Sequence, residues 1–339
     1  MEREISRGRR PVGREHRLPR NPRLREESDR WAAGISPDLP AALRRLSVGR
    51  DTTIAGIDVG EDFLDLAILV SGKSELRLAR IALRGISGDT PGAVAQLAAR
   101  IIDIAPQLAG PAIALVDSPR WPSDLDWSKP TPVARAGNVR GRLLDAHLRA
   151  LMGHVGGNGP TGAALRRLSM FPTPRFEYFA RCAASPSCKP HLRALACELF
   201  ADTFDGHDRR EAPRGGAIFT RFMLSGFAAY RALERIGAAA YECYPDLQFR
   251  LWAHGTELPP KGDHRNALTV RTRINARIAR NLGLRGAARI ATMDQADAAI
   301  LALSTAAALR FGMVAVIEEP AEGHFAVALG ASHARRLVP

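Results

Sequence analysis

Between residues 51 and 117 the apolar positions fall into short runs that predict a small sheet with one helix. Continuous or alternating apolar runs are typical of β-strands, and a Ser-Gly-Lys-Ser turn at 71–74 joins two of them as a hairpin. Such runs cover residues 53–59, 62–70, 75–83 and 112–117. From Pro91 to Ala105, apolar residues instead recur every three or four positions after an initial proline, which predicts a helix. The predicted order is three strands, a helix and a fourth strand.

The second half of the chain predicts further helices and strands after a long segment without a clear pattern. The predicted helices cover residues 216–237, 265–282 and 292–310, and the predicted strands cover 238–244, 313–317 and 325–329. Residues 118–216 combine proline-rich and glycine-rich loops with one helix near 140–152, and we interpret them as an insertion that lines the site. Helices alternating with strands around one sheet predict an α/β fold.

The two ends of the chain differ in composition from this domain, which we place at residues 51–330. Residues 1–50 hold 13 arginines against 7 acidic residues and have little apolar periodicity, so they predict a disordered basic arm. This arm is either an extension without function or a nucleic-acid-binding arm. Residues 331–339 are predicted to be a short tail.

The formal net charge of +13 suggests an anionic partner such as nucleic acid. Only four of the 48 basic residues are lysine, however, and an excess of arginine also follows from GC-rich codon usage. The longest apolar stretch, near residues 298–309, has about 12 residues, fewer than the roughly 18 that span a membrane. With no secretory signal pattern and four cysteines, the sequence predicts a soluble cytoplasmic protein.

Acidic residues stand beside short apolar runs at the ends of predicted strands and on one late helix. They are Asp58, Asp117, Glu242, Asp294 and Asp297. A buried carboxylate without a partner is costly, so such residues are expected where a cation or a reaction stabilises them. Acids on the first and fourth strands of this element order are typical of the ribonuclease-H arrangement, in which those strands are neighbours. The pattern predicts a site for Mg²⁺ or Mn²⁺ and phosphodiester hydrolysis, with two ions bridging the acids.

Each acidic position also has a simpler structural interpretation. Gly56 and Gly60 flank Asp58 and would let a phosphate backbone approach, but Asp58 could equally cap a turn. Asp117 precedes Ser-Pro and could likewise be a turn residue.

The acids of the later elements have alternatives of the same kind. Thr292 and Gln295 match a capping box, so Asp294 could merely complement the helix dipole. Asp297 lies a turn deeper among alanines, where that explanation is weaker. Glu242 lies in an aromatic strand and could face solvent.

The basic residues offer candidate phosphate contacts. A run of arginines on the predicted helix 265–282 is either a solvated face or a nucleic-acid contact surface. Its members are Arg265, Arg271, Arg273, Arg277 and Arg280.

Taken in order, these motifs resemble the domain of unknown function 429 family, described as predicted ribonuclease-H-like nucleases. The similar motifs run from about residue 54 to 327. They are Gly56-Ile-Asp58, Val116-Asp117-Ser-Pro119, Arg142-Leu-Leu-Asp145-Ala-His-Leu-Arg149, Tyr241-Glu242-Cys-Tyr-Pro245, Lys261 with its downstream arginines, Asp294-x-x-Asp297-Ala298 and Glu322-Gly323. The chain departs from the family at Arg120-Trp121, where a small apolar residue is usual, and in having a single lysine where two are common.

The resemblance implies a ribonuclease-H-like fold and a metal-dependent nuclease that acts on RNA or DNA. It implies that Asp58, Asp117 and Asp297 or Asp294 hold Mg²⁺ or Mn²⁺, with Glu242 as a further ligand or base. The implied phosphate-binding residues are Arg142, Arg149, Lys261 and Arg265.

Two other functions compete with the nuclease. The opening Asp58-Val-Gly60 is similar to that of kinases in the actin and sugar-kinase superfamily, but Asp117-Ser-Pro119 stands where such enzymes need a second Asp-x-Gly turn. A non-catalytic module that binds nucleic acid or protein would keep the same acids.

Overall fold

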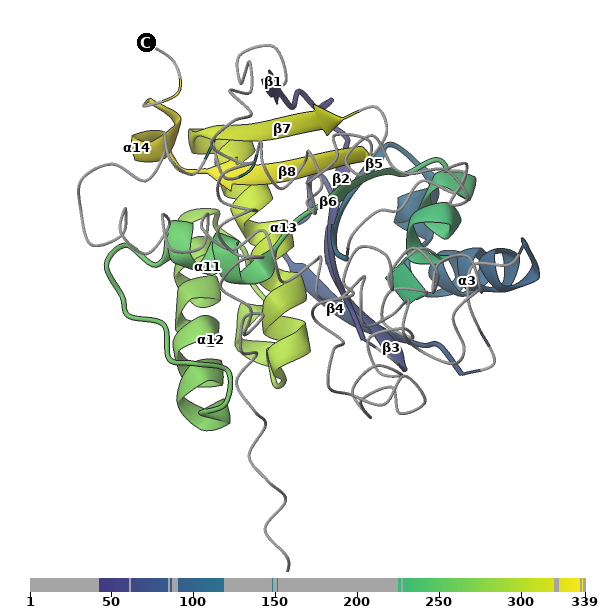
Figure 1. The fold of residues 1–339 in the computed structure, drawn as a ribbon, viewed down its shortest axis with the longest axis horizontal. Coiled ribbons are helices and arrows are strands. Elements are labelled where there is room, and N and C mark those ends of the chain that lie inside the picture. Colours follow the sequence, from purple (N-terminus) through teal and green to yellow (C-terminus); the bar gives the residue numbers. More distant parts are fainter. Residues whose placement is uncertain are drawn as a thin grey trace, which may run out of the picture.

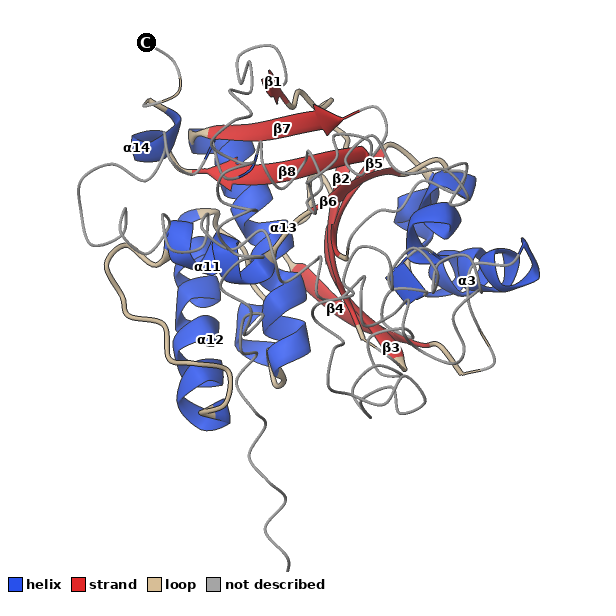
Figure 2. Cartoon of the chain, viewed as in Figure 1, coloured by secondary structure: helices blue, strands red, loops and turns tan. Residues whose placement is uncertain are grey.

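A mixed sheet of eight strands runs through the part of the chain that the structure, a computed structural model, describes (Figures 1 and 2). The described residues are 43–60, 62–84, 86, 91–118, 148, 151, 225–226, 228–319, 323–335 and 337. The strands are β1 (Leu43–Arg45), β2 (Thr53–Val59), β3 (Phe63–Leu69), β4 (Leu76–Ala82), β5 (Ala112–Asp117), β6 (Ala239–Glu242), β7 (Met313–Glu319) and β8 (Gly323–Leu329). Their order across the sheet is β1-β7-β8-β6-β5-β2-β3-β4.

The first three long strands form an antiparallel meander, and the next two join it in parallel. β2 pairs antiparallel with β3, and β3 with β4. The turn between β3 and β4 contains Gly72 at a φ of 72°, a conformation that glycine adopts without strain. β5 pairs in parallel with β2 on one side and with β6 on the other. The fourth strand therefore lies directly beside the first.

Helices cover both faces of the sheet (Figure 2). α3 (Pro91–Ile104) and the helical residues 228–235 pack on one face, in a core with Ile57, Leu66 and Val116. α11 (Pro245–Trp252), α12 (His264–Asn281) and α13 (Met293–Phe311) share a second core with Leu115 on the other face. We refer to these as the α3 face and the α13 face.

α13 lies closest to the middle of the sheet and is buried along most of its length. Its apolar residues are mostly alanines, which leave little side-chain bulk between the helix backbone and β2. Thr292 begins the helix as its N-cap, and its side chain accepts a hydrogen bond from the Gln295 N–H at 3.1 Å. Gln295 Oε1 in turn accepts from the Ala291 N–H at 2.9 Å. The predicted capping interaction between Thr292 and Gln295 is confirmed.

The predicted α/β class is confirmed, with a mixed sheet flanked by helices, and the predicted strands and long helices that fall in described residues are present. One strand and two α-helices were not predicted. β1 belongs to the sheet, pairing antiparallel with β7, so the ordered domain begins before residue 51. α11 follows β6 directly, and α14 (Ala331–Ala334) lies in the predicted tail.

Several predictions lie outside the described residues. These are residues 1–42 of the arm predicted over residues 1–50 and nearly all of the insertion predicted over residues 118–216. In the part of the chain that the structure describes, no helix is both long enough and apolar enough to cross a membrane.

Candidate functional site

Asp58 and Asp117 occupy matched positions on adjacent parallel strands. Asp58 of β2 is the register partner of Asp117 of β5. Partners on neighbouring strands are about 4.8 Å apart and direct their side chains to the same face. Asp58 is 8% exposed and Asp117 is half-buried. The predicted convergence of these two carboxylates follows from the strand order.

The pair faces α13. Ile57 and Val59, which flank Asp58 in β2, pack in the core of the α3 face. Because strand side chains alternate, Asp58 lies on the α13 face. Asp297 of α13 is only 2% exposed, and its negative charge repels that of Asp58. Three carboxylates from β2, β5 and α13 therefore lie close enough to interact electrostatically.

Lys261 adds a positive charge to this group. It lies in the segment between α11 and α12, and its Nζ donates a hydrogen bond to Asp297 Oδ2 at 2.5 Å. Asp117 and Asp58 also attract it. Burial alone would lower the pKa of Lys261, but attraction to these carboxylates and the hydrogen bond raise it above its usual value. The Lys261 side chain is 51% exposed, whereas that of Asp297 is 3% exposed, so this ion pair joins a solvent-exposed ammonium to a buried carboxylate.

We call Asp58, Asp117, Asp297 and Lys261 the acidic cluster. Burial raises the pKa of Asp58 well above its ordinary value, and repulsion by Asp117, Asp297 and Asp294 raises it further. Lys261 opposes this shift without cancelling it. Burial is the larger cause of the raised pKa of Asp58, and the nearby carboxylates add to it.

Asp297 has one oxygen bonded to Lys261 and one buried oxygen without a hydrogen-bond partner among the described residues. Burial raises its pKa, and the attraction and hydrogen bond of Lys261, together with the charge of Arg271, offset part of that effect. Its Oδ1 is buried and accepts no hydrogen bond from any described residue. A buried carboxylate oxygen in this state is costly unless a proton or a cation completes its environment.

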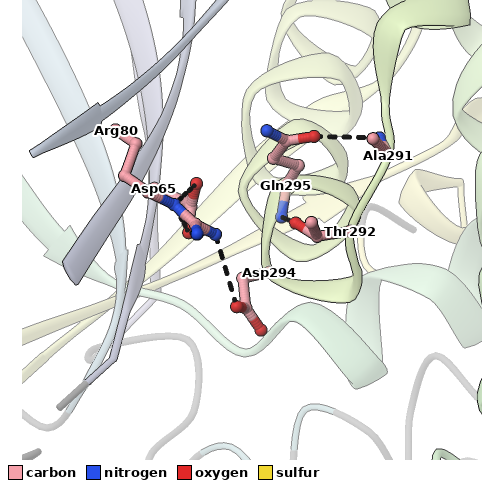
Figure 3. A network of polar contacts seen from close by, with 6 residues as sticks. All are labelled: Asp65, Arg80, Ala291, Thr292, Asp294 and Gln295. Carbon is pink, nitrogen blue, oxygen red and sulfur yellow. Dashed lines mark hydrogen bonds and ion pairs between the residues drawn. The ribbon is translucent and has the colours of Figure 1, made fainter. Parts of the chain in front are cut away.

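A fourth carboxylate extends the row across the sheet and was missed from the sequence. Asp65 of β3 is the register partner of Asp58 and is 2% exposed. Arg80, its own partner on β4, donates from Nε to Asp65 Oδ1 at 2.9 Å and from Nη2 to Oδ2 at 2.6 Å (Figure 3). This hydrogen bonding raises the pKa of Arg80. The sequence did contain a signal for this pair. Asp65 is a lone aspartate in the apolar run of β3, and Arg80 lies opposite it across the hairpin.

The Arg80 ion pair predicts a loss of stability on mutation. Arg80→Met should lower the free energy of unfolding by about 2 kcal/mol, because it leaves Asp65 buried and unpaired. This is less than for a fully buried pair, since the Arg80 side chain is 37% exposed. Urea denaturation measures the change. The double variant Asp65→Asn/Arg80→Met should lose less than Arg80→Met alone, and an equal or larger loss would contradict this account.

Asp294 is more exposed than Asp297. It is in the first turn of α13, its side chain is 60% exposed, and its Oδ2 is 3.6 Å from Arg80 Nη2 (Figure 3). Its negative charge near the N-terminus of α13 interacts favourably with the helix dipole. Arg80 contacts both Asp294 and Asp65. Of the two acids in this motif, Asp297 is the one that joins the acidic cluster.

Glu242 lies on the opposite face from Asp58 and Asp117. Its register partner on β5 is Val116, which packs in the core of the α3 face, whereas the next residue, Asp117, faces α13. Glu242 is fully buried, so its predicted alternative position on a solvent face is wrong. The structure does not bring Glu242 to the same face as the other acids, because one residue of register reverses the direction of a strand side chain.

The phosphate-binding candidates divide between exposed and buried positions. Arg142 and Arg149 lie outside the described residues. Arg265 is exposed in the first turn of α12. Arg271, predicted in the same basic run, is 1% exposed and donates to Asp246 Oδ1 at 3.0 Å and to the Pro259 carbonyl at 3.2 Å.

Arg277 donates to the Trp252 carbonyl. The basic run is thus not one solvent-facing surface. Arg271 braces the segment that carries Lys261, while Arg265, Arg273 and Arg280 are exposed.

Gly56 makes room for a helix and not for a phosphate. A Cβ at this position would lie 2.0 Å from the Ala298 carbonyl oxygen and 2.7 Å from the Ala302 nitrogen. The prediction that Gly56 admits a nucleic-acid backbone is therefore wrong, because α13 fills that space. Gly60 belongs to the turn into β3, and its N–H donates to the Phe63 carbonyl at 2.8 Å.

No group of three or more His, Cys, Asp and Glu side chains within the described residues is arranged to hold a metal ion as it stands. Asp58, Asp117 and Asp297 carry oxygen atoms of the hard type that Mg²⁺ and Mn²⁺ prefer, and Asp297 Oδ1 has no hydrogen-bond partner in the described part of the chain. Comparisons with known proteins found no matching family model, no matching curated protein and no matching solved structure.

Proposed function

We propose that this chain is a metal-dependent nuclease with a ribonuclease-H-like fold. The order β4-β3-β2-β5-β6 within the sheet supports the fold, since it has an antiparallel meander whose first strand is parallel to the fourth. The resemblance of the ordered motifs to the domain of unknown function 429 family supports it from the sequence. The insertion at about residues 118–216 belongs to the same proposal.

One observation carries the proposed activity. Asp58 and Asp117 are register partners on adjacent parallel strands, and Asp297 approaches them from α13. Burial and the neighbouring carboxylates raise the pKa of Asp58, and Asp297 Oδ1 is buried without a hydrogen-bond partner among the described residues. A divalent cation would favour the charged form of these carboxylates at neutral pH.

In this proposal one set of residues binds the cation and another set binds the substrate. Asp58, Asp117 and Asp297 would bind Mg²⁺ or Mn²⁺, which activates water and stabilises the leaving oxygen in phosphodiester hydrolysis. Lys261 of the acidic cluster and Arg265, exposed in the first turn of α12, would neutralise substrate phosphates, and the resemblance adds Arg142 and Arg149.

A cleavage assay tests the proposal. The full chain is incubated with single-stranded RNA, single-stranded DNA and an RNA–DNA hybrid in Mg²⁺ or Mn²⁺, with and without EDTA. We expect cleavage of at least one substrate, lost in EDTA and in Asp117→Asn. Asp103→Asn, an exposed change on α3, is the matched control and should retain cleavage. Cleavage that survives in EDTA or in Asp117→Asn would overturn the proposal.

A second function is favoured by one specific observation. Lys261 already occupies Asp297 Oδ2 at 2.5 Å, which suits a non-catalytic module that binds nucleic acid and keeps its acids for structural reasons. Retardation of the same substrates without cleavage in either metal would support this module over the nuclease.

A further inference from the structure

Phe63 is an exposed aromatic residue at the start of β3, on the same face of the sheet as Asp65. It is 42% exposed, whereas Asp65, two residues later, is 2% exposed. Leu64 and Leu66 pack in the core of the α3 face, so the alternation of strand side chains directs Phe63 and Asp65 to the α13 face. Two residues of a strand span about 7 Å, and Asp65 is the register partner of Asp58. Phe63 therefore lies beside the row of carboxylates on this face.

The Phe63 ring is already stacked on one side by an arginine. The guanidinium carbon of Arg80 lies over the ring, 4.9 Å from its centroid. Hydrogen bonds to Asp65 and an ion pair with Asp294 hold this guanidinium in place (Figure 3). Because a cation is attracted to an aromatic face, Arg80 in turn orients the ring. Phe63 is nevertheless 42% exposed, so the arginine leaves part of the side chain open to solvent.

The position of Phe63 distinguishes it from other exposed apolar residues, which are common singly on protein surfaces. Within the described residues, the other large apolar residues that are exposed are Ile102 of α3 and Phe311 at the end of α13. Phe63 alone of these three lies on a strand that carries a carboxylate of the row. The Arg80 guanidinium over its ring is also attracted by Asp58, a member of the acidic cluster.

An open aromatic ring at this position is suited to stacking against a nucleobase. Every base has a π-face, and stacking on protein aromatic rings is a general source of affinity for single-stranded nucleic acid. In a double helix the bases stack on one another, whereas the unstacked bases of a single strand are free to stack on a protein side chain. A ring that is held in place before binding also loses little conformational entropy when the base arrives.

We propose that Phe63, backed by Arg80, is a stacking platform for one unpaired nucleobase, and that the nucleic acid bound at this site is a single strand. This inference deepens the proposed nuclease function, on which it rests, by naming the class of substrate. The platform contacts the π-face of the base, so it accepts any of the bases. Duplex DNA and the RNA–DNA hybrid, whose bases are paired and stacked, do not use it.

Binding in EDTA tests the inference without requiring cleavage. The full chain is titrated into a fluorescein-labelled oligothymidylate, an abasic strand of the same length and a DNA duplex, and fluorescence anisotropy gives each dissociation constant. Phe63→Ala should weaken binding of the oligothymidylate at least about fivefold, because it removes the stacking surface. The same change should leave binding of the abasic strand and the duplex unaltered. Phe63→Trp, which keeps an aromatic ring, should retain the affinity of the wild type.

Phe311→Ala is the matched control for Phe63→Ala. Phe311 is 48% exposed and also has an arginine over its ring, with the Arg310 guanidinium carbon 4.9 Å from the centroid. It ends α13, about 21 Å along the helix axis from Asp297. Its replacement should therefore leave the affinity for every strand unchanged. Circular dichroism checks that each variant is folded.

The inference is overturned if the wild type does not bind the oligothymidylate, or if Phe63→Ala binds it as tightly as the wild type does. It is also overturned if Phe63→Ala weakens binding of the abasic strand equally, or if Phe311→Ala causes the same loss. The inference and the nuclease proposal fail separately. Base-dependent binding that is lost in Phe63→Ala, without cleavage of any substrate, would support the platform and refute the nuclease. Cleavage that requires Asp117, with binding that is indifferent to Phe63, would refute the platform and leave the nuclease standing.

Discussion

Gly56→Ala is expected to lower the free energy of unfolding by about 3 kcal/mol, since it forces a methyl group into a closely packed contact. The new Cβ would lie 2.0 Å from the Ala298 carbonyl oxygen and 2.8 Å from Leu301 Cβ. Both neighbours belong to α13, whose backbone cannot yield as a flexible side chain would. The helix must move away from β2, and Asp297 moves with it. Urea denaturation of the full chain measures the loss.

Gly92→Ala is the matched control, because it adds the same methyl group where nothing lies within 4 Å. Gly92 is an exposed residue in the first turn of α3, so alanine there should leave stability unchanged or raise it slightly. If Gly56→Ala proves as stable as Gly92→Ala, the close packing of α13 on β2 is wrong. Since that packing carries Asp297 to Asp58, the acidic cluster would be called into question as well.

The strands that carry Asp58 and Asp117 were predictable because their signal is local. Residues 53–59 and 112–117 are apolar runs bounded by breaking residues, and the observed strands have the same bounds. The meander and the crossing helix then place the fourth strand beside the first. Two carboxylates near the ends of those strands become neighbours without any tertiary information beyond strand order.

The face of the sheet to which each acidic side chain points was harder to predict, because it depends on the register between neighbouring strands. Glu242 and Asp117 both stand near the ends of adjacent parallel strands, yet Glu242 pairs with Val116, so the two acids face opposite sides of the sheet. Nothing in the sequence of β6 indicates whether Glu242 pairs with Val116 or with Asp117. The partnership of Asp65 with Arg80 also depends on register, but there the short hairpin turn fixes it, and the pairing was within reach of the sequence.

Contacts between distant segments carried no sequence signal. Lys261 lies in an irregular segment 36 residues before Asp297, and Arg271 supports that segment from the buried side of α12. The arginines of α12 appear equivalent in the sequence, and only the packing of the helix separates buried Arg271 from exposed Arg273. Gly56 was recognised as a close-approach position, but the sequence did not identify what approaches it.

Asp58→Asn is expected to abolish function and raise stability at the same time. Cleavage should fall by at least about 100-fold, because a bound metal ion contributes several kcal/mol to catalysis and about 1.4 kcal/mol corresponds to a factor of ten. Stability at pH 7 should rise, because the neutral amide removes a carboxylate that burial and repulsion by Asp117 and Asp297 disfavour. The cleavage assay and urea denaturation in EDTA measure the two effects.

The pH dependence of stability gives the sign of the second effect. The pKa of Asp58 is higher in the folded chain than its ordinary value of 3.8, so the folded state retains a proton that the unfolded state has released. Below pH 3.8 both states are protonated and this penalty is absent. As the pH rises through the folded-state pKa of Asp58, the wild type loses stability relative to Asp58→Asn. The stability difference should therefore be larger at pH 7 than at pH 4.

Mn²⁺ should reverse the order of stability of the wild type and Asp58→Asn. This result would distinguish a cation-binding site from a carboxylate that is only unfavourably buried. A cation that binds only the folded wild type stabilises it by mass action, whereas Asp58→Asn lacks a ligand and gains little. With Mn²⁺ the wild type should approach or exceed the stability of the variant, and EDTA should restore the original difference. If Asp58→Asn is less stable than the wild type at pH 7 in EDTA, Asp58 serves the fold through its own contacts. The unfavourable burial of the Asp58 charge, which supports the proposed metal site, would then not exist.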